Sequence, residues 1–356
     1  MATQRIGILS MQDMLANRIQ TPVQLGLDTI ARSLQADLAI HNRILQDVMG
    51  PFAATTADRR RRYGVSGQLE FKKADEFTRA HTQKVITGSE VEFPMDGFQA
   101  AVGWTAAFFK NKSVADMAAT QVAAKVGHVA SIKRELQRAF FGSSNFSTFD
   151  YRVDDVQLDV KRFVNADGAP IPMGPNGEQF DASTHTHYMF HNALDNTSAL
   201  ALVNTILEHN PSGAIKIYIN LADESAWRAL ADFKPYTDTR IIPSVNTDRP
   251  AGRLDPFNPG DRAIGIFGAA EVCVKPWGIS NYAVALDTAS PNGKPLALRT
   301  RTGGGITLDT VGTNVLFPLQ ADYMESEYGF GVWNRVAGAV LYHAAGAVAY
   351  VDPVLP

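Results

Sequence analysis

The stretch that decides the fold is 113-SVADMAATQVAAKVGHVASIKRELQRAFF-141. Its apolar residues recur every three or four positions, which predicts one apolar stripe along an α-helix. Ser113 and Asp116 have the spacing of a capping pair, and Gly142 follows the last apolar residue. At about 1.5 Å per residue, such a helix runs roughly 40 Å and suits a structural spine. The predicted stripe is Val114, Ala118, Val122, Val126, Val129, Ile132, Leu136 and Phe140.

The residues before this helix, 64–103, predict an extended excursion. They carry many charges of both signs and short apolar–polar alternations such as Leu69-Glu70-Phe71-Lys72. Alternation with a period of two predicts strands with one covered face. Nothing in this stretch supplies a core, and a lone two-stranded ribbon is marginal in water. We therefore expect a long two-stranded ribbon that lies on another surface.

The first part of the chain predicts a helical arm. Apolar residues recur at helical spacing over 23–48, Thr21-Pro22 is a suitable helix start, and Gly50-Pro51 is a stop. This arm and the extended stretch precede any core. We expect them to find no partner within their own subunit and to lie on a neighbouring copy of the same chain.

Four consecutive arginines, Arg59 to Arg62, close the arm. The first interpretation is a basic patch that is solvated or paired at an interface, and the alternative is contact with packaged nucleic acid or with a neighbour's acidic surface. Together with charged residues of the extended stretch, they are the candidates for inter-subunit contact. The candidates are Arg59, Arg60, Arg61, Arg62, Glu70, Lys72, Lys73, Asp75, Glu76 and Arg79.

The chain beyond the spine predicts a mixed body of strands and helices, so the fold class is α+β. Residues 145–195 have strand and loop patterns, and residues 196–209 have the pattern of a second helix. A buried-strand pattern follows over 214–220, and more strand patterns run from 263 to 351. Cys273 lies in one of them, which predicts a buried, inert thiol.

The composition is that of a folded protein with no strong electrostatic bias. The chain has 356 residues, 45% hydrophobic and 19% charged, and a net charge of −3. A basic field for nucleic acid is missing, and no apolar run reaches the roughly 20 residues of a membrane span. The single cysteine forbids an intrachain disulfide, and the first residues lack a signal-peptide pattern. We expect assembly in a cytoplasm and no membrane partner.

A histidine cluster, His185, His187 and His191, is the one candidate for chemistry. Histidines two apart on a strand face the same side and could ligate a metal, as in some metal-dependent hydrolases. Such enzymes also need later histidines and a carboxylate, which the sequence does not place in a fitting context. Gly303 to Gly305 lack the remainder of a phosphate loop. We therefore predict no enzyme activity, catalytic residue, metal or cofactor.

The order of these parts resembles the major capsid proteins of tailed bacteriophages, which have the Hong Kong 97-type fold. Residues 91–97 and 101–106 are similar to the family's extended loop as it returns to the body. The helix 113–141, ending in Phe140-Phe141-Gly142, is similar to the spine helix. Tyr328 to Arg335 and the closing residues 349–353 are similar to the final strand and end of many such proteins.

The resemblance implies a division of the chain. Residues 1–63 would be the N-terminal arm, 64–105 the extended loop, 106–194 the peripheral domain with its spine helix, 195–320 the axial domain, and 321–356 the C-terminal return strands. The implied function is a structural one: self-assembly as hexamers and pentamers into an icosahedral shell that encloses double-stranded DNA. The implied location is the virion capsid, assembled in the host cytoplasm.

Further partners and alternatives follow from the same resemblance. Scaffolding, portal and decoration proteins are implied as partners, and packaged DNA as a weak, non-specific contact. An encapsulin-type nanocompartment shell, which shares this fold and encloses a cargo enzyme, is one alternative. A metal-dependent hydrolase using His185, His187 and His191 is the other.

Overall fold

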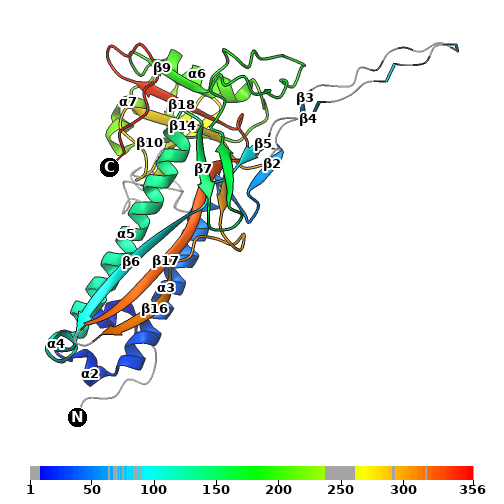
Figure 1. The fold of residues 1–356 in the computed structure, drawn as a ribbon. Helices are drawn as coiled ribbons and strands as arrows, with labels where there is room; N and C mark the ends of the chain where they lie inside the picture. The colour runs from blue at the N-terminus through cyan, green and yellow to red at the C-terminus, as the bar shows by residue number, and fades with distance from the viewer. Residues whose placement is uncertain are drawn as a thin grey trace.

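The computed structural model describes residues 9–62, 90–236, 261–290, 293–316 and 319–355, together with the isolated positions 65–66, 71, 73, 76–77, 79, 81–82 and 86–87. The chain forms an elongated molecule with long helices and strands along its length and a second sheet at one end (Figure 1). The predicted α+β class is confirmed.

The predicted spine helix is confirmed as α5, Val114–Phe141. The Ser113 hydroxyl accepts the backbone N–H of Asp116, whose carboxylate accepts the backbone N–H of Ser113, and Gly142 ends the helix. The two ends of the predicted apolar stripe are buried, but the prediction that its middle is buried is wrong. Val126 is 63% exposed and Val129 45%, while Gln121 and His128 are buried in their place.

The arm comprises α1 (Met11–Ala16), α2 (Pro22–Leu25) and α3 (Leu27–Met49). The single helix predicted over 23–48 is broken at Gly26, whose φ of 98° no helix accepts and glycine tolerates best. Figure 1 shows α3 and α5 running along the same length of the molecule. Polar side-chain contacts join them at two places: Asp37 with Lys125 at 2.6 Å, and His41 with His128 at 3.1 Å.

The prediction that the arm and the extended stretch have no partner in their own subunit is wrong for residues 9–62 and 90–103, while the described residues from 71 to 82 stay exposed. Met14 and Ile30 are buried in one apolar cluster with Val114 of the spine helix. Phe52 lies in the main core beside Phe140, and Phe93 is fully buried. The early residues therefore bury apolar side chains on spine and sheet segments that the sequence supplies later.

A five-stranded sheet lies along the helices, and its organising strand is β17. One half of β17 pairs with both β16 and β6, and the other half pairs with β15, which also pairs in parallel with β1. Met324 and Tyr328 are buried on the helix side, while Tyr323 is exposed. The strands are β1 (Ala53–Thr56), β6 (Asp96–Thr105), β15 (Leu296–Arg299), β16 (Asp309–Leu316) and β17 (Leu319–Val332).

A seven-stranded sheet forms the wide end, with α6 (Asn196–Leu207) packed on it. Its order is β11-β12-β13-β10-β14-β18-β9, and the short helices η1 (Leu221–Asp223) and α7 (Glu224–Arg228) follow β10. Cys273 lies buried on β13, as predicted. The strands are β9 (Tyr188–His191), β10 (Ile215–Ile219), β11 (Phe233–Pro235), β12 (Arg262–Phe267), β13 (Ala270–Val274), β14 (Tyr282–Asp287) and β18 (Gly338–His343).

Three small ribbons and one short helix complete the fold. The predicted two-stranded ribbon is confirmed where it is described, because β2 pairs antiparallel with β5, and β3 with β4. A hairpin of β7 and β8 lies beside the spine helix (Figure 1). These elements are β2 (Arg60–Arg62), β3 (Val65–Ser66), β4 (Ile86–Thr87), β5 (Glu90–Glu92), α4 (Ala106–Asn111), β7 (Phe146–Asp150) and β8 (Val156–Val160).

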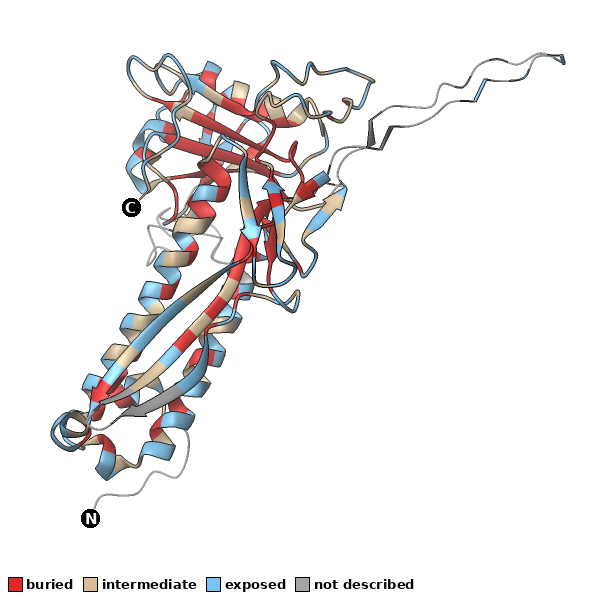
Figure 2. Cartoon of the chain, viewed as in Figure 1, coloured by how far each residue is buried: buried red, intermediate tan, exposed pale blue. Residues whose placement is uncertain are grey.

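Burial is concentrated at the wide end. Figure 2 shows the seven-stranded sheet and the adjoining part of α5 largely buried, while the narrow end mixes buried and exposed residues. The sheets cross the sequence-derived domain boundaries: β15 and β16 precede residue 320 yet belong to the five-stranded sheet, and β18 follows it yet belongs to the seven-stranded sheet. The two sheets therefore do not coincide with the predicted domains.

Candidate assembly surfaces

The four arginines of the candidate contact region alternate between partners because they lie on or beside a strand. Arg60 pairs with Glu90 and Glu92 of the opposite strand β5, at 3.4 and 3.6 Å. Arg61 points the other way, and its guanidinium lies 4.2 Å from the centre of the Trp333 ring. Burial lowers the pKa of Arg61 from its usual value. Arg59 pairs with Asp154 at 3.0 Å, and Arg62 with Glu90 at 3.6 Å.

These pairs bear on both interpretations of the arginine run. Each arginine has a partner within its own chain, so the run is not an isolated block of positive charge. The pairs at Arg60 and Arg62 are exposed and contribute little stability, typically about 0–1 kcal/mol. A contact between these arginines and a neighbouring subunit stays a prediction.

The other candidates lie between β3 and β4, in the excursion. Lys73, Glu76 and Arg79 are described and exposed. Phe71 is 99% exposed, which is unusual for a large aromatic side chain and marks an interaction surface when several such residues occur together. Glu70, Lys72 and Asp75 lie outside the described residues.

A second surface is apolar and lies on the outer sides of α3 and α5. Ile40, Ile44 and Val48 follow one another at intervals of four on α3, and all three are exposed. Val126 and Val129 are exposed on α5, one residue away from the Lys125 and His128 that contact α3. Exposed apolar side chains on two adjoining helices form a surface that gains free energy when another protein covers it.

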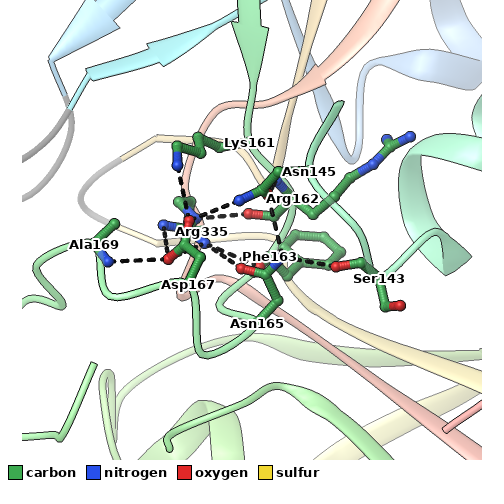
Figure 3. Close-up of polar contacts among 9 residues, drawn as sticks. All are labelled: Ser143, Asn145, Lys161, Arg162, Phe163, Asn165, Asp167, Ala169 and Arg335. Carbon is green, nitrogen blue, oxygen red and sulfur yellow. Dashed lines mark hydrogen bonds and ion pairs between the residues drawn. The ribbon is translucent and has the colours of Figure 1, made fainter. Parts of the chain in front are cut away.

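A buried polar network holds the spine's end to the C-terminal part of the chain (Figure 3). Arg335 is only 1% exposed, and its guanidinium donates to the backbone carbonyl of Arg162 at 2.7 Å and to the side chain of Asn165 at 2.8 Å. It also pairs with Asp167 at 3.1 Å. Asn165 in turn donates to the carbonyl of Ser143, just beyond α5. The network fixes the segment that leads to the histidines.

Asp167 is the charged centre of this network. Burial alone would raise its pKa, but Arg335, a hydrogen bond from Lys161 and two further donors together hold the pKa well below its usual value. The carboxylate is therefore charged throughout the neutral range and balances the buried guanidinium.

The structure changes the histidine site that the sequence predicts. His185 and His187 are brought together, but His191 lies at the far end of β9, beside His343 on β18, and is not part of the group. Their neighbours are Glu208 and His209 at the end of α6. The proposed hydrolase triad of His185, His187 and His191 is therefore wrong in its membership.

The new group is tight and partly buried: His187 is buried, His185 and His209 are half-buried, and Glu208 is the most exposed of the four. The Nε2 atoms of His185, His187 and His209 lie 3.1 to 3.3 Å from one another. A carboxylate oxygen of Glu208 lies 3.3 Å from His185 Nε2 and 3.7 Å from His209 Nε2. Burial, followed by the charge of His209, lowers the pKa of His187 far below its usual value, and burial lowers the pKa of His209 to about 4.

Sequence reasoning missed Glu208 and His209 because nothing local connects them to the earlier pair. The two halves are more than twenty positions apart and belong to different elements. The available signal is a Glu-His pair at the end of the helix predicted over residues 196–209. Within the described residues, this is the one group of three or more potential metal ligands.

Comparison with solved structures addresses the fold. A structure from Mycobacterium phage Patience superposes with a TM-score of 0.66 at 18% identity, covering 99% of this chain and 97% of the other. The chain has a phage-capsid fold. The resemblance predicted from the sequence is therefore confirmed at the level of fold.

Two other similar structures are more distant. A structure from Gordonia phage Cozz has a TM-score of 0.46 at 10% identity and covers 84% of this chain and 87% of its own. The capsid of a native GTA particle has a TM-score of 0.44 at 12% identity and covers 83% of this chain and 90% of its own. No protein-family model and no curated protein matches the sequence. Among the described residues, no helix combines the length and apolar character needed to cross a membrane.

Proposed function

We propose that this chain is a major capsid protein. Copies of it assemble as hexamers and pentamers into an icosahedral shell that encloses double-stranded DNA. Its role is structural, and the chain is not an enzyme. Because one fold can serve several functions, the fold by itself is an analogy, and the surface of the chain has to supply the physical argument.

The observation that carries the proposal is the apolar surface that the described residues leave exposed. Phe71 and Phe77 of the excursion are 99% and 91% exposed, and the outer sides of α3 and α5 expose Ile40, Ile44, Val48, Val126 and Val129. A repeating assembly covers such surfaces in every copy at once. Many modest contacts then act together, so the shell is far more stable than any one of its contacts.

The proposal assigns roles to the parts of the chain. Residues 1–63 act as the N-terminal arm and 64–105 as the extended loop that reaches a neighbour. Residues 106–194 are the peripheral domain, 195–320 the axial domain at the centre of hexamers and pentamers, and 321–356 the return strands. The intrachain packing of residues 9–62 means that the arm acts as part of the subunit body and offers its exposed side to neighbours.

Further partners belong to the same proposal. Scaffolding, portal and decoration proteins act during assembly in the host cytoplasm, and the finished chain resides in the virion capsid. Packaged DNA is a weak and non-specific contact. A net charge of −3 supports this, because a strongly basic interior would hold the genome and hinder its release.

Electron microscopy of the purified chain tests the proposal directly. We expect shells, tubes, or rings of hexamers and pentamers when the full chain is expressed alone or with its scaffolding partner. Light scattering should show a mass many times that of the monomer. A stable monomer at high concentration, with its exposed segments protected from protease, would overturn the proposal.

The content of the particles separates a virus from a nanocompartment. Shells recovered from infected cells should contain nuclease-protected double-stranded DNA. Particles that contain a single cargo enzyme and no protected DNA would favour an encapsulin-type shell instead. Both hypotheses, the virus capsid and the nanocompartment, require assembly, so this experiment distinguishes them only by what the particles contain.

A further inference from the structure

We infer that His185, His187, His209 and Glu208 form a binding site for one divalent transition-metal ion, of the zinc class. The site lies where the end of α6 meets the segment that enters β9. It does not depend on whether the chain assembles into shells.

The donor atoms have the spacing of a tetrahedral ion site. Zinc binds imidazole nitrogen at 2.0–2.1 Å, so two ligands of a tetrahedral ion lie roughly 3.3–3.4 Å apart. The three Nε2 atoms lie 3.1, 3.2 and 3.3 Å apart, and the Glu208 oxygen lies 3.3 Å from His185 Nε2 and 3.7 Å from His209 Nε2. All four atoms lie within 4.8 Å of one another.

The backbone prepares His187 for this role. Its Nδ1 lies 2.7 Å from the carbonyl oxygen of Gly338, and a carbonyl only accepts hydrogen bonds, so Nδ1 carries the proton. In the neutral ring, Nε2 is then left with a free lone pair directed at the other two nitrogens. Histidine ligands of metal ions typically donate their other ring nitrogen in this way.

Hydrogen bonds serve only some of the close contacts in the group. With Nδ1 of His187 protonated, the protons on Nε2 of His185 and His209 are the two available, and they make at most two hydrogen bonds, one to Glu208 and one to His187. The other close contacts between these donor atoms have no proton to share. A cation at the centre satisfies all four atoms together.

The surroundings favour a closed structural site over a catalytic one. The ring of Phe180 packs over His185 and His209, with centroid distances of 4.7 and 4.3 Å. Four protein ligands fill a tetrahedral shell and leave no position for water or substrate. Imidazole and carboxylate ligands suit zinc, and the group contains no thiolate.

The ion would join two elements that otherwise meet through side-chain packing. His185 and His187 are held by backbone hydrogen bonds to Ala166 and Val164, in the segment fixed by Arg335. Glu208 and His209 end the helix that covers the seven-stranded sheet. Binding would therefore stabilise the folded subunit, because an ion that binds only the folded state raises its unfolding temperature.

Metal analysis of the untagged full chain tests this inference, with zinc supplied and excess ion removed by dialysis. We expect about one zinc ion per chain in the wild type, and loss of that ion in His185→Gln and in Glu208→Gln. His191→Gln is the matched control, because it removes a histidine of the same sequence cluster that lies outside the group, and it should keep the ion.

Two further measurements separate binding from misfolding. Cobalt substituted into the wild type should give the intense visible absorption of a tetrahedral ion, and His191→Gln should give the same spectrum. A chelator should lower the unfolding temperature of the wild type and of His191→Gln, and leave that of His185→Gln unchanged. A wild-type chain that binds neither zinc nor cobalt, or a His185→Gln chain that retains a full complement of zinc, would overturn the inference.

Discussion

The guanidinium of Arg299 donates to the carboxylate of Asp150 at 2.6 Å, and the two side chains are 2% and 1% exposed. Arg299 lies on β15 and Asp150 at the end of β7, so the pair fastens the β7–β8 hairpin to the five-stranded sheet. A second donor of Arg299 reaches the carbonyl of Phe93 at 3.0 Å, just after β5. One buried cation therefore joins three segments that are far apart in the sequence.

Removal of one member of this pair should be far more damaging than removal of both. Asp150→Ala leaves Arg299 buried without its counter-charge, and we expect a loss of about 3–5 kcal/mol in the free energy of unfolding. The double variant Asp150→Leu with Arg299→Met should recover most of that loss. Urea unfolding of unassembled subunits measures both, and equal losses in the single and double variants would contradict this account.

The Asp167 network predicts a loss of stability in acid. The pKa of Asp167 is lower in the folded state than its unfolded value near 3.8, so the charged carboxylate stabilises the fold above about pH 4. This contribution disappears as the pH falls through the lower, folded-state pKa. Asp167→Asn should therefore be less stable than the wild type at pH 7, and the difference should shrink toward pH 2. Unfolding at several pH values gives the curve, and a constant difference would contradict the assignment.

His128 should give the folding stability a second, separate pH dependence at milder pH. Burial, followed by the charge of His41, lowers its folded-state pKa from 6.5 to about 4. Between those two values the unfolded chain binds a proton that the folded chain does not, so stability falls as the pH drops from about 6.5 to 4.

The matching variant is His128→Gln, which keeps a group able to hydrogen-bond Ser326. Its stability should decline less than that of the wild type over this window, by at most about 3 kcal/mol. Circular dichroism of the two chains from pH 7 to pH 4 makes the comparison. Parallel curves would show that His128 titrates normally in the folded protein.

The two faces of the spine helix should respond differently to truncation. Leu136 is 1% exposed in the main core, so Leu136→Ala should cost about 2–5 kcal/mol of stability. Val126→Ala removes an exposed side chain and should change stability by less than about 0.5 kcal/mol. Thermal unfolding of both variants provides the test, and a large loss in Val126→Ala would mean that α5 is covered within its own subunit.

The excursion should matter for assembly and not for the fold of the subunit. Phe71→Asp places a charge on a side chain that is 99% exposed, so the subunit's unfolding free energy should stay the same. If a neighbour covers Phe71 in the shell, the buried charge should weaken or abolish assembly. Light scattering and microscopy follow assembly, and normal shells from this variant would remove Phe71 from the contact region.

The parts of the fold that sequence reasoning found are those with local causes. The spine helix is specified by its own cap, Ser113 with Asp116, and by the spacing of its apolar residues. Its middle was misjudged because tertiary partners decide burial there: His128 contacts His41 of α3 and Ser326 of β17, which turns Val126 outward. No periodicity within one helix contains that information.

The predictions for the arm and for the histidine group are wrong for the same physical reason. The arm looks partnerless because the side chains that cover it, such as Val114 and Phe140, come later in the sequence. Likewise, the spacing of His185 and His187 indicates a possible pair of ligands, but the other two potential ligands, Glu208 and His209, come from the end of α6. In both cases the contact joins residues that are far apart in the sequence, so a local pattern reveals only one of the two partners.

The pairing of β6 with β17 also sets an order of events during synthesis. β6 ends at Thr105, whereas its partner β17 begins at Leu319. In the same way, β1 cannot pair until β15 has been synthesised. Contacts between such distant segments form late in folding. A nascent chain on the ribosome cannot complete either pairing until most of its length has emerged. Incomplete copies therefore expose unpaired strand edges and apolar surface until translation nears its end, and such species are prone to aggregate.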